Sequence, residues 1–375
     1  MIPLNQNLNA LKRSQIRVFA NLAKATPGCA SLTIGEPDLD TPENIKQAAI
    51  DALTANQTHY APNQGTPALR NAIADFESNR GNPTKPEQVL VTVGACQALF
   101  TALLGILNPG EEIIVPTPGF GLYETIATIA GAKTVPLDVT KTGFQITKEG
   151  LDAVITEKTK AIIVNSPCNP TGVIFSEESL KNVKEAVLGK SVFVICDNVY
   201  HDLSYAPCPD ISCDPDLKEQ MILCQSFSKP WAMTGWRIGY LTCPDYVMDR
   251  LLLLSAATIT AIPTFLQEAA ITALKTSVEH MREVYRKRRD YVCQRLKAMG
   301  LSFPEPEGAF YVFVDIAKFG MDSATFCTRM IREGLLAAVP GACFGADDYI
   351  RLSYCYSDEE LKTGLDRLEA FIATL

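Results

Sequence analysis

Residues 221–229 read MILCQSFSK, and residues 233–240 read MTGWRIGY. The first stretch begins with a run of apolar residues, which predicts a strand buried in the core, and it ends on Lys229 beside serine hydroxyls. Arg237 follows that lysine by eight positions. A buried strand that ends in chemically active residues is typical of an α/β sheet with a ligand site at its strand ends.

The residue types at this strand end suit a phosphorylated aldehyde. The amine of Lys229 can bond to an aldehyde carbon as a Schiff base, while the hydroxyls of Ser226 and Ser228 and the guanidinium of Arg237 can hold a phosphate. The predicted ligand is therefore pyridoxal phosphate. In the alternative interpretation Lys229 is a surface lysine and Arg237 an ordinary ion-pair residue, and a four-residue motif alone does not separate the two.

The remainder of the chain predicts an α/β fold. Short β-branched runs alternate with helical stretches from residue 89 onward, and nearly all of these runs are apolar throughout, which indicates a mostly parallel sheet with helices on both faces. The predicted strands are 89–93, 112–116, 133–139, 161–165, 191–196, 221–226 and 237–243. Ligands of such sheets bind beyond the carboxyl ends of the strands.

Polar side chains follow two of these strands. Asn169 lies among prolines after strand 161–165, and Asp197 directly follows strand 191–196, with Tyr200 three positions further on. A carboxylate at that edge could pair with a protonated pyridine nitrogen, and a phenol could bond the ring hydroxyl. The alternative for Asp197 is a helix N-cap, which is a common role of Asp after a strand.

Two further strand ends offer parts of a cofactor site. The backbone N–H groups of Ala95 and Cys96 stand at the start of a predicted helix, where they could cradle a phosphate. Phe120 lies in a turn after strand 112–116 and could lie against a flat ring, although an aromatic residue in a loop more often serves packing.

The C-terminal part has a different, segregated α+β pattern that predicts a second, smaller domain. Arg351 is the one arginine of its alternating strand, 349–354. We expect an N-terminal arm and part of the small domain over residues 1–45, a large cofactor-binding domain over 46–285, and the small C-terminal domain over 286–375.

Composition restricts the function classes. The chain has 375 residues, 47% of them hydrophobic, and a formal charge of -8, which disfavours nucleic acid and anionic membranes as partners. Its twelve cysteines form no C-x-x-C pair and indicate reduced thiols in a cytoplasmic protein. We predict neither a signal peptide nor a membrane span. Three histidines without ligand spacing predict no metal site.

As a set, the motifs resemble those of the class I, fold-type-I pyridoxal phosphate aminotransferases. The likeness covers nearly the whole chain and is greatest for the branch that holds bacterial aspartate, aromatic and N-acetyl-LL-diaminopimelate aminotransferases. The motifs are GEPD at 35–38, NPTG at 169–172, Asp197 with Tyr200, SFSK at 226–229, GWRIG at 235–239 and RLS at 351–353.

The resemblance implies a role for each residue of the site. Lys229 would be the Schiff-base lysine and proton carrier, and Asp197 would pair with the pyridine nitrogen. Tyr200 and Asn169 would bond the ring oxygen. The phosphate would be held by Ser226, Ser228, Arg237 and the N–H groups of Ala95 and Cys96. The protein would be a homodimer with shared active sites, in which Tyr60 of the neighbouring subunit also contacts the phosphate. Phe120 would stack on the cofactor ring, and the substrate carboxylate would be bound by Gly35, Asn169 and Arg351. Cys96 and Phe120 depart from the residues common in relatives.

The predicted activity is transfer of an amino group from an L-amino acid of the aspartate, aromatic or N-acetyl-LL-diaminopimelate type to 2-oxoglutarate or another 2-oxo acid. A carbon-sulfur β-lyase of the same fold would use the same lysine and aspartate and is the main alternative. A non-catalytic pyridoxal phosphate-binding regulator is more distant, because only about thirty residues precede Gly35, too few for a winged helix. A nicotinamide oxidoreductase would need a third glycine after 119–121.

Overall fold

The computed structural model describes residues 2, 5–11 and 14–375. Its centre is a seven-stranded sheet in the order β2-β8-β7-β6-β5-β3-β4, in which β8 alone runs antiparallel to its neighbours. The predicted α/β fold is confirmed, with all seven expected strands in this sheet. Their bounds are β2 (Val89–Thr92), β3 (Glu112–Thr117), β4 (Lys133–Asp138), β5 (Thr159–Asn165), β6 (Phe193–Asp197), β7 (Met221–Ser226) and β8 (Gly239–Thr242).

Six of the seven strands differ from their predicted bounds by one or two residues, and two of these differences concern the candidate site. The strand expected from 237 begins at Gly239, because Arg237 has φ of 55°, a left-handed conformation that a strand cannot contain. Strand β6 ends on Asp197, so this carboxylate belongs to the strand instead of following it. Strand β4 lies at the edge of the sheet and is partly exposed, whereas the inner strands are buried.

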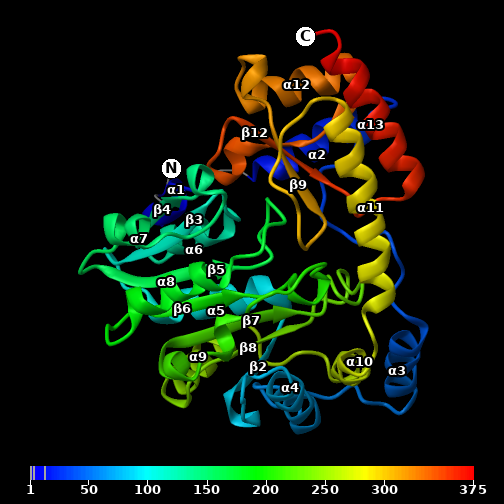
Figure 1. Ribbon diagram of the computed structural model, residues 1–375. Helices are drawn as coiled ribbons and strands as arrows, with labels where there is room; N and C mark the ends of the chain where they lie inside the picture. Colours follow the sequence, from blue (N-terminus) through cyan, green and yellow to red (C-terminus); the bar gives the residue numbers. More distant parts are fainter. Residues whose placement is uncertain (1, 3–4, 12–13) are drawn as a thin grey trace.

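Helices cover both faces of the central sheet because alternate strand residues point to opposite sides (Figure 1). Ile195 and Ile222 pack with helices α5, α6 and α9 in one cluster, whereas Val194 and Leu223 pack with α7 and α8 in another. The helix bounds of this part are α3 (Glu43–Thr54), α4 (Pro67–Asn79), α5 (Gly94–Ile106), α6 (Leu122–Ile129), α7 (Lys148–Val154), α8 (Glu177–Val187), α9 (Asp245–Thr258) and α10 (Thr264–Leu274).

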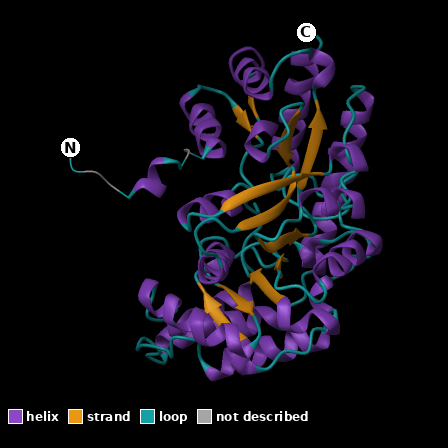
Figure 2. Cartoon of the chain, turned by 90° about the vertical axis from the view of Figure 1, so that its left-hand side faces the viewer, coloured by secondary structure: helices purple, strands orange, loops and turns teal. Residues whose placement is uncertain are grey.

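A second group of elements packs around a three-stranded antiparallel sheet, β11-β12-β9, and a two-stranded parallel pair, β1-β10. The pairing of β1 with β10 attaches the N-terminal segment to the C-terminal part. Figure 2 shows the strands of both groups inside and the helices outside. The bounds are α1 (Gln6–Asn9), α2 (Gln15–Ala25), β1 (Ala30–Ser31), α11 (Glu279–Ala298), β9 (Tyr311–Asp315), α12 (Ser323–Gly334), β10 (Leu336–Ala337), β11 (Val339–Pro340), β12 (Tyr349–Ser353) and α13 (Asp358–Ile372).

Local sequence signals explain where several helices begin. Ser357 and Glu360 cap the start of α13 reciprocally, each side chain accepting from the other residue's backbone N–H group. Helix α4 begins at Pro67 after Thr66, whose hydroxyl accepts from the N–H of Leu69. Within the described part of the chain, no helix has the length and apolar character that a bilayer crossing requires.

Candidate active site

A cavity of about 380 Å³ lies at the carboxyl ends of strands β5, β6 and β7. The chain therefore places its ligand site where an open α/β sheet is expected to have one. The cavity is lined by most of the predicted site residues, namely Gly35, Ala95, Cys96, Phe120, Asn169, Asp197, Tyr200, Ser226, Ser228, Lys229, Arg237 and Arg351.

Lys229 follows the end of β7 and points into this cavity. Its ammonium donates a hydrogen bond of 2.6 Å to the carbonyl oxygen of Gly35, which comes from the N-terminal segment. Burial lowers the pKa of the Lys229 amine from its ordinary value, because the charged form is desolvated there. A lower pKa leaves a larger share of the amine unprotonated at neutral pH, which is the form that can attack an aldehyde carbon.

Asp197 is buried at the end of β6, and only one of its two carboxylate oxygens accepts a hydrogen bond from the described side chains. Its Oδ2 accepts a 2.6 Å hydrogen bond from the hydroxyl of Tyr123, whereas its Oδ1 has no partner among the described residues. Burial raises the pKa of the carboxyl to about 6, against the opposing effects of the Tyr123 hydroxyl and the Val199 backbone. A buried acceptor without a donor is costly, so this oxygen is suited to a donor on a ligand.

The hydroxyls, one arginine and a helix start converge at one end of the cavity. The Ser226 hydroxyl donates to the Ser228 hydroxyl over 2.9 Å, and the Arg237 guanidinium donates to the carbonyl of Thr234 over 2.8 Å. Helix α5 begins beside them at Gly94, where a Cβ would lie 2.8 Å from a guanidinium nitrogen of Arg237. Free N–H groups, hydroxyls and a guanidinium form a favourable site for a phosphate.

Arg351 enters the cavity from β12 and is only 2% exposed. Its guanidinium donates to the side-chain oxygen of Asn169 over 2.8 Å and to the carbonyl of Thr33 over 2.6 Å, while its Nε is buried without a partner among the described residues. The ring centroids of Tyr311 and Phe344 lie 4.3 and 5.0 Å from the guanidinium carbon. Packing on two rings holds a planar group in one orientation, as recognition of a carboxylate requires.

Comparison with known proteins shows the family. The profile described as "Aminotransferase class I and II" matches residues 27–368. The chain belongs to this family. It is 38% identical to a probable N-acetyl-LL-diaminopimelate aminotransferase of Bacillus subtilis (strain 168), over 98% of this chain and 95% of that protein. It is 37% identical to an aspartate aminotransferase of Pyrococcus abyssi, over 98% and 97%. The aspartate aminotransferase from Thermus thermophilus with maleate superposes with a TM-score of 0.94 at 35% identity, over 99% and 100%.

This class I aminotransferase depends on pyridoxal phosphate, as the sequence predicts. The side chains of the cavity fit that cofactor. The unpartnered Oδ1 of Asp197 matches a protonated pyridine nitrogen, and the end formed by Ser226, Ser228 and Arg237 matches the phosphate. The β-lyase and the regulator are not favoured, because these relatives are named as aminotransferases.

The aminotransferase site contains two phenols that the sequence did not single out. The hydroxyl of Tyr311, on β9, lies 2.8 Å from that of Tyr200, and Tyr123, on α6, bonds Asp197. Burial raises the pKa of Tyr200 well above its ordinary value, so the group remains a neutral phenol. Tyr311 also explains the glycine at position 35, because a Cβ there would lie 1.8 Å from the Tyr311 hydroxyl oxygen.

Phe120, the predicted ring contact, lies in the cavity, whereas Tyr60, the predicted intersubunit contact, lies outside it. Phe120 lines the cavity and packs edge-on against Tyr123 at 5.9 Å between ring centroids. Tyr60 does not line it, and its side chain is 88% exposed beside a depression formed with residues 261–265. Because Tyr60 lies outside the cavity of its own subunit, it could contact a cofactor site only in another subunit.

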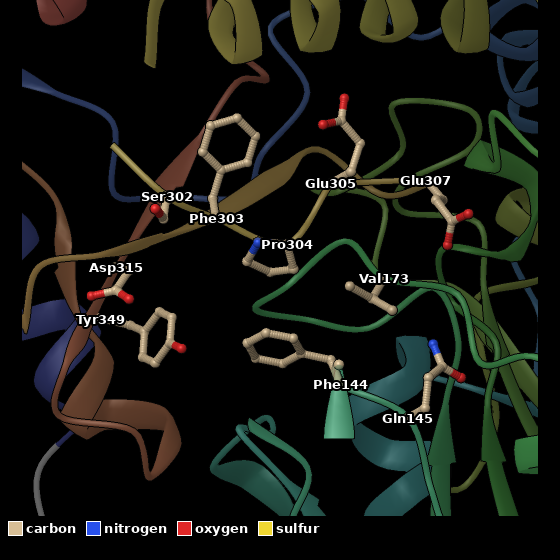
Figure 3. A pocket seen from close by; sticks show the side chains of 11 residues that line it. Phe144, Gln145, Val173, Ser302, Phe303, Pro304, Glu305, Glu307, Asp315 and Tyr349 are labelled. Carbon is tan, nitrogen blue, oxygen red and sulfur yellow. The ribbon is translucent and has the colours of Figure 1, made fainter. Parts of the chain in front are cut away.

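A second depression, of about 450 Å³, lies between the central sheet and the C-terminal elements (Figure 3). Its three acidic side chains are already engaged. Glu305 pairs with Lys297, Glu307 accepts from the N–H of Ile174, and Asp315 accepts from the N–H of Ala317. Across the described ranges, no three potential metal ligands are grouped together.

Proposed function

We propose that this aminotransferase moves the amino group of an L-amino acid to 2-oxoglutarate or another 2-oxo acid. The proposed donors follow the names of its relatives, which are aspartate, aromatic and N-acetyl-LL-diaminopimelate aminotransferases. The observation that carries the proposal is the opening of Lys229, Asp197 and Arg351 onto one cavity. These groups supply a base, a counter-charge for a pyridinium and a carboxylate binder.

The proposed role of Lys229 is first to bond the cofactor and then to move a proton. Pyridoxal phosphate, when bound, provides an electron sink for the pair left at Cα after proton removal. Lys229 is suited to carry that proton, because burial lowers the pKa of its amine. Asp197 keeps its charge next to the pyridine nitrogen, and Tyr200 and Asn169 are proposed to donate to the ring oxygen. The amide nitrogen of Asn169 is available for this, since its oxygen accepts from Arg351.

The remaining proposed roles concern the cofactor phosphate and the substrate α-carboxylate. Ser226, Ser228, Arg237 and the first N–H groups of α5, from Ala95 and Cys96, are proposed to hold the phosphate. Arg351 is proposed to bind the substrate α-carboxylate together with Asn169 and the backbone near Gly35. In both places a guanidinium is held by hydrogen bonds to its own chain, so binding an anion costs little further ordering.

The proposed assembly is a homodimer in which Tyr60 reaches the phosphate of the partner's site, supported by its 88% exposure. We further propose that residues 46–285 form the large domain and that 1–45 and 286–375 form the arm and small domain, supported by the pairing of β1 with β10. A cytoplasmic location is supported by twelve cysteines that are all free thiols.

The proposed function is tested by initial rates across an amino-donor panel with 2-oxoglutarate as acceptor. We expect glutamate to form in step with the 2-oxo acid of the donor. A β-lyase would instead release ammonia and pyruvate from a donor with a sulfur leaving group, with no need for an acceptor. Acceptor-independent release of ammonia, without glutamate, would contradict the proposal.

A further inference from the structure

One buried side chain of the cavity bonds two of the proposed cofactor contacts at once. Asn165 is the last residue of β5, lines the cavity and is 6% exposed. Its Nδ2 donates a hydrogen bond of 2.8 Å to the backbone carbonyl of Asp197, and its Oδ1 accepts one of 2.9 Å from the backbone N–H of Asn169. The amide of Asn165 therefore connects the backbones of these two residues.

The bond to Asp197 lies where two strands end. Asn165 and Asp197 form the last pair in the register of β5 and β6, which are parallel neighbours in the central sheet (Figure 1). The ladder of backbone hydrogen bonds between these strands ends at that pair. The side chain of Asn165 adds one more bond across the strands, at the carbonyl of the residue whose carboxylate lines the cavity. This bond holds the end of β6 against the end of β5.

The bond to Asn169 closes the loop that follows β5. The chain leaves the sheet and turns through residues 166–168, and the N–H of Asn169 then bonds the side chain of Asn165 four positions earlier. Asparagine side chains commonly replace a backbone acceptor in this way. On the other side of Asn169, the N–H of Gly172 donates to the carbonyl of Cys168 over 2.8 Å. The position of this loop relative to β5 therefore depends on Asn165.

The two residues that Asn165 connects are proposed to contact different atoms of one rigid ring. Asp197 is proposed to pair with the pyridine nitrogen, and Asn169 to donate to the ring oxygen. A flat ring satisfies both contacts only if they are correctly spaced, and a displacement of about 1 Å weakens such contacts strongly. Tyr123 and Arg351 bond the side chains of Asp197 and Asn169, respectively. Asn165 bonds their backbones, so it is suited to set the distance between them.

We propose that Asn165 is a positioning residue that fixes the spacing of Asp197 and Asn169 and thereby the orientation of the cofactor ring. The inference rests on the proposed function, because it takes these two residues as the contacts of the ring. Asn165 then raises cofactor affinity through its two neighbours and not through a contact of its own. A residue that only stabilised the end of β5 would affect folding and leave cofactor binding unchanged, so the two roles can be separated.

The first experiment measures pyridoxal phosphate binding in Asn165→Leu, because leucine has the branching of asparagine but forms neither hydrogen bond. We expect the dissociation constant of the cofactor to rise about 10- to 100-fold. The visible circular-dichroism band of the bound cofactor should also weaken, since this signal arises from a fixed orientation of an achiral ring. Asn165→Thr, whose hydroxyl can keep one of the two bonds, should fall in between and decides the test if the leucine variant does not fold.

The matched control is Asn182→Leu. Asn182 is 9% exposed in α8, donates from its amide to the carbonyl of Ile146 over 3.1 Å and does not line the cavity. Both leucine variants should lose stability in urea, because each leaves a buried carbonyl without its donor. Asn182→Leu should leave cofactor affinity and the dichroism band unchanged. If Asn165→Leu behaves like this control in both readouts, Asn165 only stabilises the end of β5 and the proposal is overturned.

A double-mutant cycle shows whether Asn165 acts through its neighbours. Asn165→Leu is combined with Asp197→Asn and, separately, with Asn169→Ala. With only one ring contact left, the spacing no longer matters, so the effect of Asn165→Leu on the dissociation constant should fall to about threefold or less in each background. Fully additive effects would show that Asn165 contacts the cofactor itself and would also overturn the proposal.

Amino transfer by the wild type separates this inference from the proposed function. If the wild type transaminates donors of the panel while the Asn165 variants bind the cofactor as the control does, only the positioning role fails. If the wild type transaminates no donor, the proposed function fails, whatever the cofactor affinities of the variants.

Discussion

Replacing Asp197 by asparagine should stabilise the cofactor-free protein and weaken the cofactor-loaded one. Burial raises the pKa of this carboxyl from its ordinary 3.8 to about 6, so the folded state binds the proton more tightly than the unfolded state. The resulting stability is fully present below pH 3.8 and is lost as pH rises through 6. At about 1.4 kcal/mol per pKa unit, the charged carboxylate lowers the free energy of unfolding by about 3 kcal/mol above pH 7.

The assay is urea unfolding of the cofactor-free wild type and Asp197→Asn at pH 5 and pH 8. About half of the change in stability falls within this range. We therefore expect the free energy of unfolding of the variant, relative to wild type, to rise by about 1.5 kcal/mol from pH 5 to pH 8. Costs that do not depend on pH, such as an unsatisfied amide, cancel in this comparison.

The loaded protein should behave in the opposite way, because the charge of Asp197 then has a pyridinium partner. We expect Asp197→Asn to raise the dissociation constant of pyridoxal phosphate about 10- to 100-fold at pH 8. Glu77→Gln is a matched control, since burial also raises the pKa of Glu77 but this residue does not line the cavity. It should leave cofactor affinity unchanged. Unchanged cofactor affinity in Asp197→Asn would refute the role of the buried carboxylate.

Three further predictions follow from the same geometry. Arg351→Lys should lower kcat/KM about 30- to 1000-fold for every amino acid and 2-oxo acid, because lysine cannot form a two-point contact with the α-carboxylate; a defect confined to dicarboxylic substrates would contradict this. Mixed dimers of inactive Lys229→Ala and Tyr60→Ala subunits should regain activity, and failure in dimers shown to be mixed would argue against shared sites. Gly94→Ala should weaken pyridoxal phosphate binding at least about tenfold in a cofactor titration, because a Cβ there displaces the Arg237 guanidinium; unchanged affinity would refute that contact.

Much of the fold could be predicted because the inner strands consist mostly of apolar residues. Each of β5, β6 and β7 is buried on both faces, and this made their runs recognisable without knowledge of their partners. The start of β8 could not be predicted, since nothing in the sequence indicates the left-handed conformation of Arg237. The edge strand β4 carries only a weak apolar signal because it is partly exposed.

Part of the candidate site could also be predicted from the sequence, and part could not. Asp197 is the last residue of β6 and Lys229 follows β7, and because these two strands are parallel neighbours, sequence order alone brings both residues to one edge of the sheet. The contacts of Tyr311 with Tyr200 and of Arg351 with Asn169 join positions 111 and 182 residues apart, and neither residue's spacing indicates its partner. Arg17 lines the cavity from α2, an amphipathic helix whose pattern indicates its buried face but not the cavity beside it.

The most direct test of the account is to identify the residue that bonds the cofactor. Borohydride makes the bond between a lysine amine and a bound aldehyde permanent, so peptide mapping by mass spectrometry of the reduced, loaded protein locates it. We predict a stoichiometric pyridoxyl group on the peptide that contains Lys229, and none on Lys229→Ala. A pyridoxyl group on another lysine of the wild type, with Lys229 unmodified, would contradict the central claim.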